Sequence, residues 1–85
     1  MDELTKFVKE RDEMLKRCDI AELRKFVEAN ERFYDLRFRK AIRKAPDHVL
    51  EITLHKMIVS VPKLPKRLRD NSIRWLYERG YSLSI

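Results

Sequence analysis

Prolines and a single glycine limit what this chain can fold into more than any other feature. Gly80 is its one glycine, and the prolines are Pro46, Pro62 and Pro65. Folds built from tight β turns need glycine at many positions of positive φ, so one glycine in 85 residues argues against them. Helix-favouring Lys, Arg, Glu, Leu and Ala are plentiful between these breaks. We therefore expect an all-α protein.

Apolar residues at helical spacing divide the chain into about five short helices. Asp2, Asp19 and Asp47 are in positions to cap the first, second and fourth of them. The expected ranges are about 2–17, 19–29, a third that begins between 31 and 35 and is stopped by Pro46, 48–61, and 65–79. The length suits one compact domain over residues 1–85, with a short C-terminal tail at 81–85.

The fourth segment, residues 48–61, is predicted to be the central helix. One stripe of it is apolar, and two further apolar residues, Ile52 and Val59, lie on the opposite side. A helix that is apolar on two faces is normally the most buried one. The residues of the main stripe are Leu50, Leu54, Met57, Ile58 and Val61.

Charge is unevenly distributed along the chain. Residues 1–31 carry seven Lys or Arg against nine Asp or Glu, whereas residues 32–85 carry thirteen against five. An uneven field of this kind attracts polyanions or acidic protein surfaces. The acidic start and basic remainder also permit weak homo-oligomerisation.

The third segment combines a core face with a basic face. On a helical wheel, Leu36 lies in the middle of the cationic arc, where a solvated surface does not require leucine. In the last segment, cations alternate with apolar residues along a strip that ends at Tyr77. The residues expected on the core face are Tyr34, Phe38, Ala41, Ile42 and Ala45. The candidate binding residues are Arg32, Leu36, Arg37, Arg39, Lys40, Arg43, Lys44, Lys66, Arg69 and Tyr77.

Two functions fit this basic surface. The first is a small nucleic-acid-binding or nucleoprotein-associated protein that contacts the phosphate backbone of DNA or RNA, with the segment 62–69 as a second contact. The second is an interaction module, such as an adaptor or small inhibitor, that docks Leu36 and the surrounding cations on an acidic protein. The sequence favours the first because arginine predominates among these cations.

Signatures of catalysis are weak throughout the sequence. Phosphate-binding loops and nucleophile elbows need more glycines than this chain has. His48, Glu51 and His55 share one flank of a helix, but we interpret Glu51 and His55 as an ordinary surface pair rather than metal ligands. Cys18 falls on an apolar stripe, which predicts a buried structural cysteine. We expect no enzyme activity, no cofactor and no metal.

The apolar runs and the cysteine content of the sequence indicate where the protein is located. No run approaches the eighteen or so apolar residues of a membrane span, and the start of the chain does not resemble a secretory signal. A lone cysteine cannot form an internal disulfide. We therefore expect a cytoplasmic protein with no membrane partner.

Overall fold

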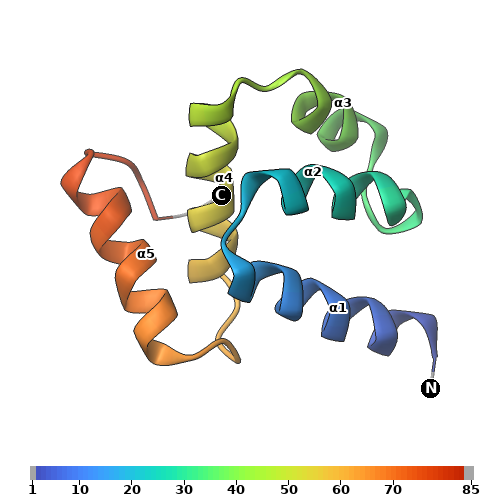
Figure 1. The fold of residues 1–85 in the computed structure, drawn as a ribbon, viewed down its shortest axis with the longest axis horizontal. Helices are drawn as coiled ribbons and strands as arrows, with labels where there is room; N and C mark the ends of the chain where they lie inside the picture. Colours follow the sequence, from blue (N-terminus) through green and yellow to red (C-terminus); the bar gives the residue numbers. More distant parts are fainter. Residues whose placement is uncertain (1, 84–85) are drawn as a thin grey trace.

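The computed structural model describes residues 2–83, and within this range its regular elements are all helices. None of these helices is long and apolar enough to cross a membrane. The all-α prediction is therefore confirmed (Figure 1). The elements are α1 (Glu3–Arg17), α2 (Ile20–Ala29), the 3-10 turn η1 (Glu31–Phe33), α3 (Leu36–Lys44), α4 (Asp47–Val59) and α5 (Lys66–Glu78).

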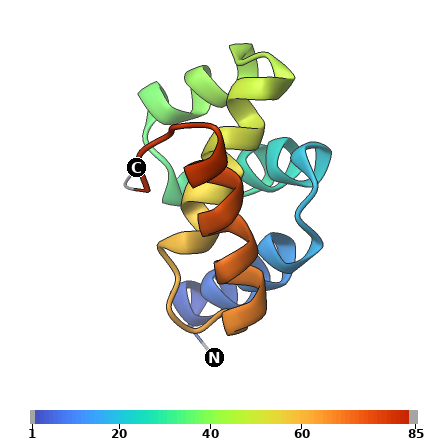
Figure 2. The ribbon, with the colours of Figure 1, turned by 90° about the vertical axis from the view of Figure 1, so that its left-hand side faces the viewer.

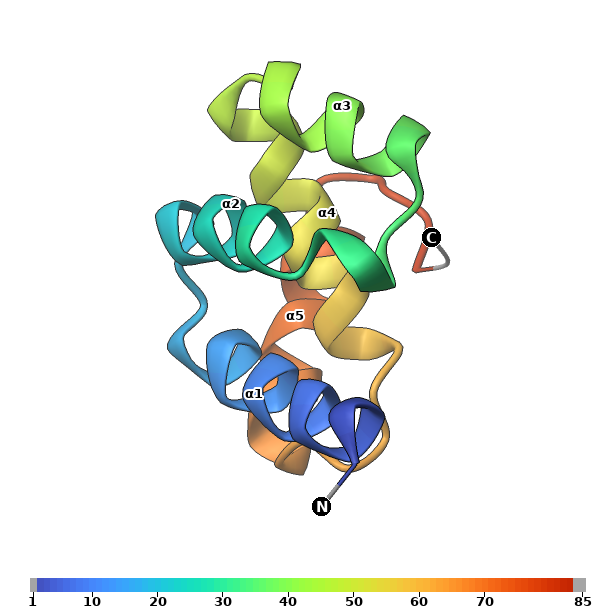
Figure 3. The ribbon, with the colours of Figure 1, turned by 90° about the vertical axis from the view of Figure 1, so that its right-hand side faces the viewer.

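Helix α4 lies in the middle of a compact globule whose radius of gyration is 12.7 Å. Helix α5 packs along one side of α4, whereas α1 and α2 pack on the other side (Figure 1). From the α5 side, α5 runs in front of α4 (Figure 2). Helix α3 packs mainly on α2, at the periphery of the fold (Figure 3).

The main apolar stripe of α4 forms the centre of the core, as predicted. Leu50 and Ile58 are fully buried and Leu54 is 1% exposed. On the opposite side of the helix, Ile52 and Val59 are partly buried. Helices α1, α2 and α5 therefore pack around α4, the helix that has apolar residues on both sides.

Aspartates begin the first two helices, as the sequence predicts. The Oδ1 atom of Asp2 accepts a hydrogen bond from the amide of Thr5 at 2.7 Å. Asp19 does the same for the amide of Ala21 at 2.8 Å. Each carboxylate satisfies an amide that has no partner inside its helix.

The predicted cap of α4 is wrong. Asp47 is the first residue of the helix, and Pro46 occupies the N-cap position without a side-chain hydrogen bond. The carboxylate of Asp47 instead pairs with the guanidinium of Arg24 on α2, at 3.5 Å. The sequence cannot show this, because the competing partner comes from another helix.

Gly80 ends the last helix, again as predicted. Its φ of +76° lies in the left-handed region that favours glycine. The amide of Gly80 donates to the carbonyl of Tyr77, and the amide of Tyr81 donates to that of Leu76. These two bonds form a Schellman motif. Residues 81–83 of the predicted tail are non-helical and exposed, and Ser84 and Ile85 lie outside the described residues.

Cys18 is exposed, which contradicts its prediction as a buried structural cysteine. It follows α1 with a φ of +50°, and its amide donates to the carbonyl of Leu15. The left-handed conformation of Cys18 ends α1, so this residue no longer follows the helical spacing that would place it on the apolar stripe. Partial burial, and then the nearby Glu51 and Asp19, raise the pKa of the Cys18 thiol and keep it in its less reactive protonated form.

Candidate functional site

Helix α3 carries most of the predicted binding residues. Two of its side chains anchor it in the core. Ile42 is 5% exposed in the core and Phe38 packs partly buried beside it. Asp35 begins the helix by accepting a hydrogen bond from the amide of Phe38 at 2.7 Å. One prediction for the inner face is wrong, because Ala41 is exposed. Tyr34 packs against the core as predicted, although it precedes the helix. Ala41 is about 100° around the helix from Ile42, which turns it away from α2.

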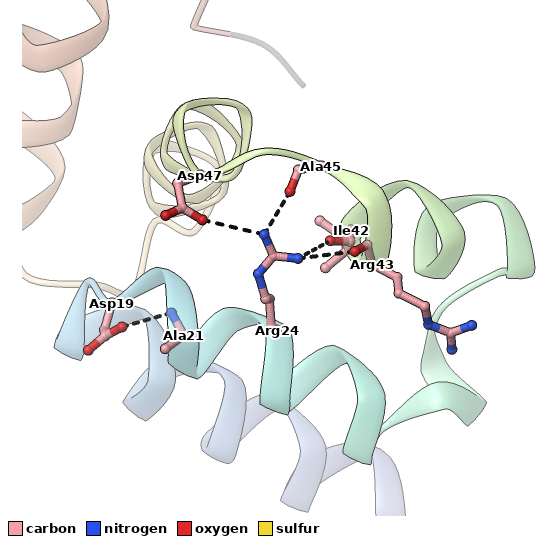
Figure 4. Close-up of polar contacts among 7 residues, drawn as sticks. All are labelled: Asp19, Ala21, Arg24, Ile42, Arg43, Ala45 and Asp47. Atoms are coloured by element: carbon pink, nitrogen blue, oxygen red, sulfur yellow. Dashed lines mark hydrogen bonds and ion pairs between the residues drawn. The ribbon is translucent and has the colours of Figure 1, made fainter.

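The C-terminal end of α3 is held by Arg24, a residue that sequence reasoning missed. Its Nη1 atom donates to the carbonyls of Ile42, at 3.0 Å, and Arg43, at 3.2 Å. Its Nη2 atom donates to the carbonyl of Ala45 at 2.7 Å and faces Asp47 (Figure 4). A guanidinium at this end satisfies carbonyls that have no partner in the helix and opposes the negative end of its dipole. Arg24 thereby joins α2, α3 and the start of α4.

Three predicted cations are paired with acids from residues 3–31. Such exposed ion pairs stabilise a fold by little, but each carboxylate competes with a phosphate for the same guanidinium. Arg39 is the least available, because its side chain is only 24% exposed. The pairs are Arg32 with Glu3 at 2.7 Å, Arg39 with Glu31 at 3.2 Å, and Arg43 with Glu28 at 3.6 Å.

The remaining cations of α3 form a short exposed row. Arg37, Lys40 and Lys44 make no ion pair with any residue of the described range 2–83. Their spacing of three and four residues places them within an arc of about 60° on the outer surface of α3. Leu36 borders this row and is 54% exposed. We call Arg37, Lys40 and Lys44 the α3 cation row.

The predicted residues of α5 belong to a different surface. The three views, turned about a common vertical axis, place α3 at the top of the molecule and the start of α5 at the bottom (Figures 1–3). Lys66 pairs with Asp70 at 3.8 Å, and the Nε atom of Arg69 donates to the carbonyl of Leu64. Tyr77, further along α5, is 81% exposed. The structure therefore does not bring Lys66 and Arg69 together with the α3 cation row.

The interpretation of His55 as a surface residue paired with Glu51 is wrong. His55 is 9% exposed, and its Nδ1 atom lies 2.9 Å from the Oγ atom of Ser72 on α5. Its ring stacks on that of Trp75, with 4.2 Å between the centroids, and the guanidinium of Arg79 lies 4.1 Å from the Trp75 ring centroid. Ser72 is 1% exposed, so this Ser–His pair is closed to a substrate. Its geometry suits a polar link between α4 and α5.

The buried imidazole predicts a pH dependence of stability. Burial lowers the pKa of His55 below its ordinary value of 6.5, and Arg79 lowers it further against the opposing charge of Glu51. The folded chain therefore binds this proton less readily than the unfolded chain. Stability should fall as the pH decreases from about 6.5 through the folded-state pKa, by less than about 1.4 kcal/mol per pH unit.

Urea unfolding between about pH 5 and 8 measures this effect. His55→Gln keeps a partner for Ser72 but removes the imidazole, so the pH-dependent contribution should disappear. The matched control is His48→Gln, which removes an exposed histidine from the same helix and should leave the profile unchanged. Equal profiles for the wild type and His55→Gln would contradict the assignment.

A surface groove of about 690 Å³ lies between α1 and α2 and was not predicted. Met14 and Phe26 supply its apolar lining. Lysines and glutamates, among them Lys6, Lys9 and Glu10, surround these two residues. Because cations and acids are mixed along the groove, its charge does not favour a polyanion. The α3 cation row is therefore the better candidate for polyanion binding.

Comparison with known proteins gives no relative from which a function could be transferred. No protein family, curated protein or solved structure shows significant similarity to the chain.

Proposed function

We propose that this protein is a small non-enzymatic, cofactor-free binding protein of the cytoplasm that contacts the phosphate backbone of nucleic acid through the α3 cation row. The observation that supports this function is the row itself. Arg37, Lys40 and Lys44 are exposed, share one side of α3 and have no acidic partner among residues 2–83. Phosphate groups would supply the missing counter-charges.

The dimensions of the row fit a short stretch of backbone. Seven residues separate Arg37 from Lys44, which corresponds to about 10 Å along a helix. Phosphates follow one another at about 3.4 Å of rise along each strand of a duplex, so the row spans about three of them. Helix α3 contains no Asn or Gln, which are the side chains suited to adenine edges. Binding is therefore expected to depend little on base sequence.

Salt dependence of binding tests the proposal. If three phosphates are neutralised, the logarithm of the affinity for duplex DNA should fall with the logarithm of the salt concentration at a slope near −2.7, about −0.9 per cation. The triple variant Arg37→Gln, Lys40→Gln, Lys44→Gln should lose most of this slope. Fluorescence anisotropy with a labelled duplex and a labelled single strand measures both quantities.

A matched control comes from α5 and the segment that precedes it. Lys63, Arg67 and Arg74 are also exposed and make no ion pair within residues 2–83, so changing all three to Gln removes the same charge. This control should keep most of the slope. The proposal fails if neither duplex nor single-stranded nucleic acid binds at about 50 mM salt. An equal loss in both variants would show a response to overall charge rather than binding by α3.

A second candidate function is docking on an acidic protein, and the 54% exposure of Leu36 favours it. Leu36 adjoins Arg37, and arginine is enriched at protein interfaces. Leu36→Ala should abolish capture of a protein partner while it barely changes nucleic-acid affinity.

Pull-downs with and without nuclease distinguish a nucleic-acid partner from a protein partner. Sedimentation at low and high salt tests weak self-association of the protein through its opposite charges.

A further inference from the structure

The groove between α1 and α2 is lined by these two helices alone. The helices lie side by side (Figures 1 and 3), and no other helix of residues 2–83 contributes to the lining. The lining runs from Lys6 to Arg17 on α1 and from Glu22 to Ala29 on α2. These ranges correspond to about 16 Å and about 10 Å along the two helices, or about two to three helical turns. We call this feature the α1–α2 groove.

The floor of the α1–α2 groove is apolar and is held in place by the core. Met14 is 1% exposed and belongs to the core, and Phe26 is partly buried and packs against it. The ring of Phe26 also contacts that of Phe7, with 5.4 Å between their centroids. At the end of α2, Ala29 has only a methyl group, which leaves room for a side chain of a partner. A partner therefore meets a surface that is already ordered, and this lowers the entropic cost of docking.

Ion pairs change the balance of charge along the sides of the groove. Glu13 pairs with Lys16 at 3.3 Å. Glu22 pairs with Arg17 at 3.9 Å. Glu10 is then the one acid of the lining that makes no ion pair within residues 2–83, whereas three lysines of the lining make none. Unpaired positive charge therefore remains on both sides of the groove and is complementary to a partner with acidic flanks. The three lysines, all exposed, are Lys6 and Lys9 on α1 and Lys25 on α2.

The helical walls of the groove also favour one backbone conformation for a partner. The backbone groups in the middle of α1 and α2 are bonded inside their helices, so an extended peptide would find no strand edge to pair with. A helix satisfies its own backbone and needs only side-chain contacts from the groove. Apolar residues at positions i, i+4 and i+7 of such a helix form a stripe of about two turns, which matches the length of the groove.

We propose that the α1–α2 groove docks an acidic amphipathic helix of a partner protein. The apolar stripe of that helix lies over Met14 and Phe26. Acidic residues on its flanks face Lys6 and Lys9 on one side and Lys25 on the other. Burial of the stripe supplies most of the affinity, whereas the lysines discriminate against basic helices. No residue of the α3 cation row lines this groove, so the site does not depend on the proposed nucleic-acid function.

Two synthetic peptides of about 15 residues test the proposal, because they differ only in the sign of their flanking charges. Both carry leucine at positions i, i+4 and i+7 and alanine on the opposite face. One has glutamate on both flanks of the leucine stripe, and the other has lysine. Amide chemical shifts in ¹H–¹⁵N spectra give the dissociation constants and the residues contacted. The glutamate peptide should bind about tenfold more tightly, because each flank contact changes from repulsion to attraction.

A variant without the three unpaired lysines should lose most of this preference. It is the triple variant Lys6→Gln, Lys9→Gln, Lys25→Gln, whose substitutions are all at exposed positions. The matched control changes three other exposed lysines that make no ion pair within residues 2–83 and lie outside the groove. This control removes the same charge and should keep the preference. Its substitutions are Lys40→Gln, Lys44→Gln and Lys63→Gln.

Four outcomes would overturn the assignment. The first three are an absence of glutamate-peptide binding at millimolar concentration, equal affinities of the two peptides, and an equal loss of preference in both triple variants. The fourth is occupation of the groove by a second copy of this chain. Sedimentation of the free protein as a dimer, with shifts at Met14, Phe26 and Ala29 that change on dilution, would identify that case.

Discussion

Replacing Arg24 by methionine should lower the free energy of unfolding by about 2 kcal/mol, which is large for a partly exposed side chain. Methionine keeps most of the apolar stem but removes the guanidinium. The carbonyls of Ile42, Arg43 and Ala45 then lose their shared donor, and Asp47 loses its ion pair. Hydrogen bonds from a charged donor to carbonyls contribute more than neutral ones, although water replaces part of the loss at this partly exposed position.

Urea unfolding followed by circular dichroism measures this effect, and the neighbouring position supplies its control. Lys25→Met removes an exposed cation from the same helix that makes no ion pair within residues 2–83, and it should change stability by less than about 0.5 kcal/mol. Arg24→Lys keeps the charge but not the planar fork, so it should recover only part of the loss. Equal stabilities of Arg24→Met and Lys25→Met would show that Arg24 does not hold α3.

Truncating a side chain at the centre of the core should lower the free energy of unfolding by more than the loss of the Arg24 guanidinium does. Leu54→Ala removes a side chain that is 1% exposed in the middle of α4, between α5 and the α1–α2 pair. The lost burial and the resulting cavity should lower the free energy of unfolding by about 3 kcal/mol. For a chain of this size, such a loss is a large part of the total stability.

A second aliphatic residue of the same helix is the control for this prediction. Val49 is 39% exposed, and Val49→Ala should change stability by less than about 1 kcal/mol. Thermal and urea unfolding of both variants, with far-ultraviolet spectra to verify retained helix, measure the difference. Similar losses in the two variants would mean that α4 is not the central helix of the folded protein in solution.

The sequence predicts helix ends where local chemistry determines them. Asp2 and Asp19 bind amides of the first turn that follows each of them, and Gly80 adopts the left-handed turn that ends α5. These effects act within a few residues, so the sequence contains all the information they need. The central position of α4 was also predictable, because Ile52 and Val59 add apolar residues opposite its main stripe.

Contacts between helices explain what the sequence could not predict. Arg24 falls beside Leu23 on α2, and only the packing of α3 shows that its guanidinium reaches three carbonyls. His55 looks like a surface residue until α5 covers it with Ser72 and Trp75. The one sequence signal for Arg24 is indirect: Pro46 ends α3, so the last carbonyls of that helix need donors from elsewhere.

The helix that carries most of the candidate residues was predicted correctly, but the arrangement of those residues on the surface was not. The basic residues of α3 and of α5 look equivalent in the sequence, whereas the fold separates α3 from the start of α5. Acidic residues within the range 3–31 then pair with Arg32, Arg39 and Arg43. A count of charges in the sequence includes these paired cations. Only the tertiary structure distinguishes them from Arg37, Lys40 and Lys44.

The peripheral attachment of α3 would couple the proposed polyanion binding to local unfolding. Because α3 rests mainly on α2 and on the bonds from Arg24, its detachment exposes less apolar surface than opening α4 would. Amide hydrogens of α3 should therefore exchange with solvent faster than those of α4. A polyanion that binds only the docked form of α3 would slow this exchange in proportion to its free concentration over its dissociation constant, so exchange rates in α3 would report occupancy of the cation row.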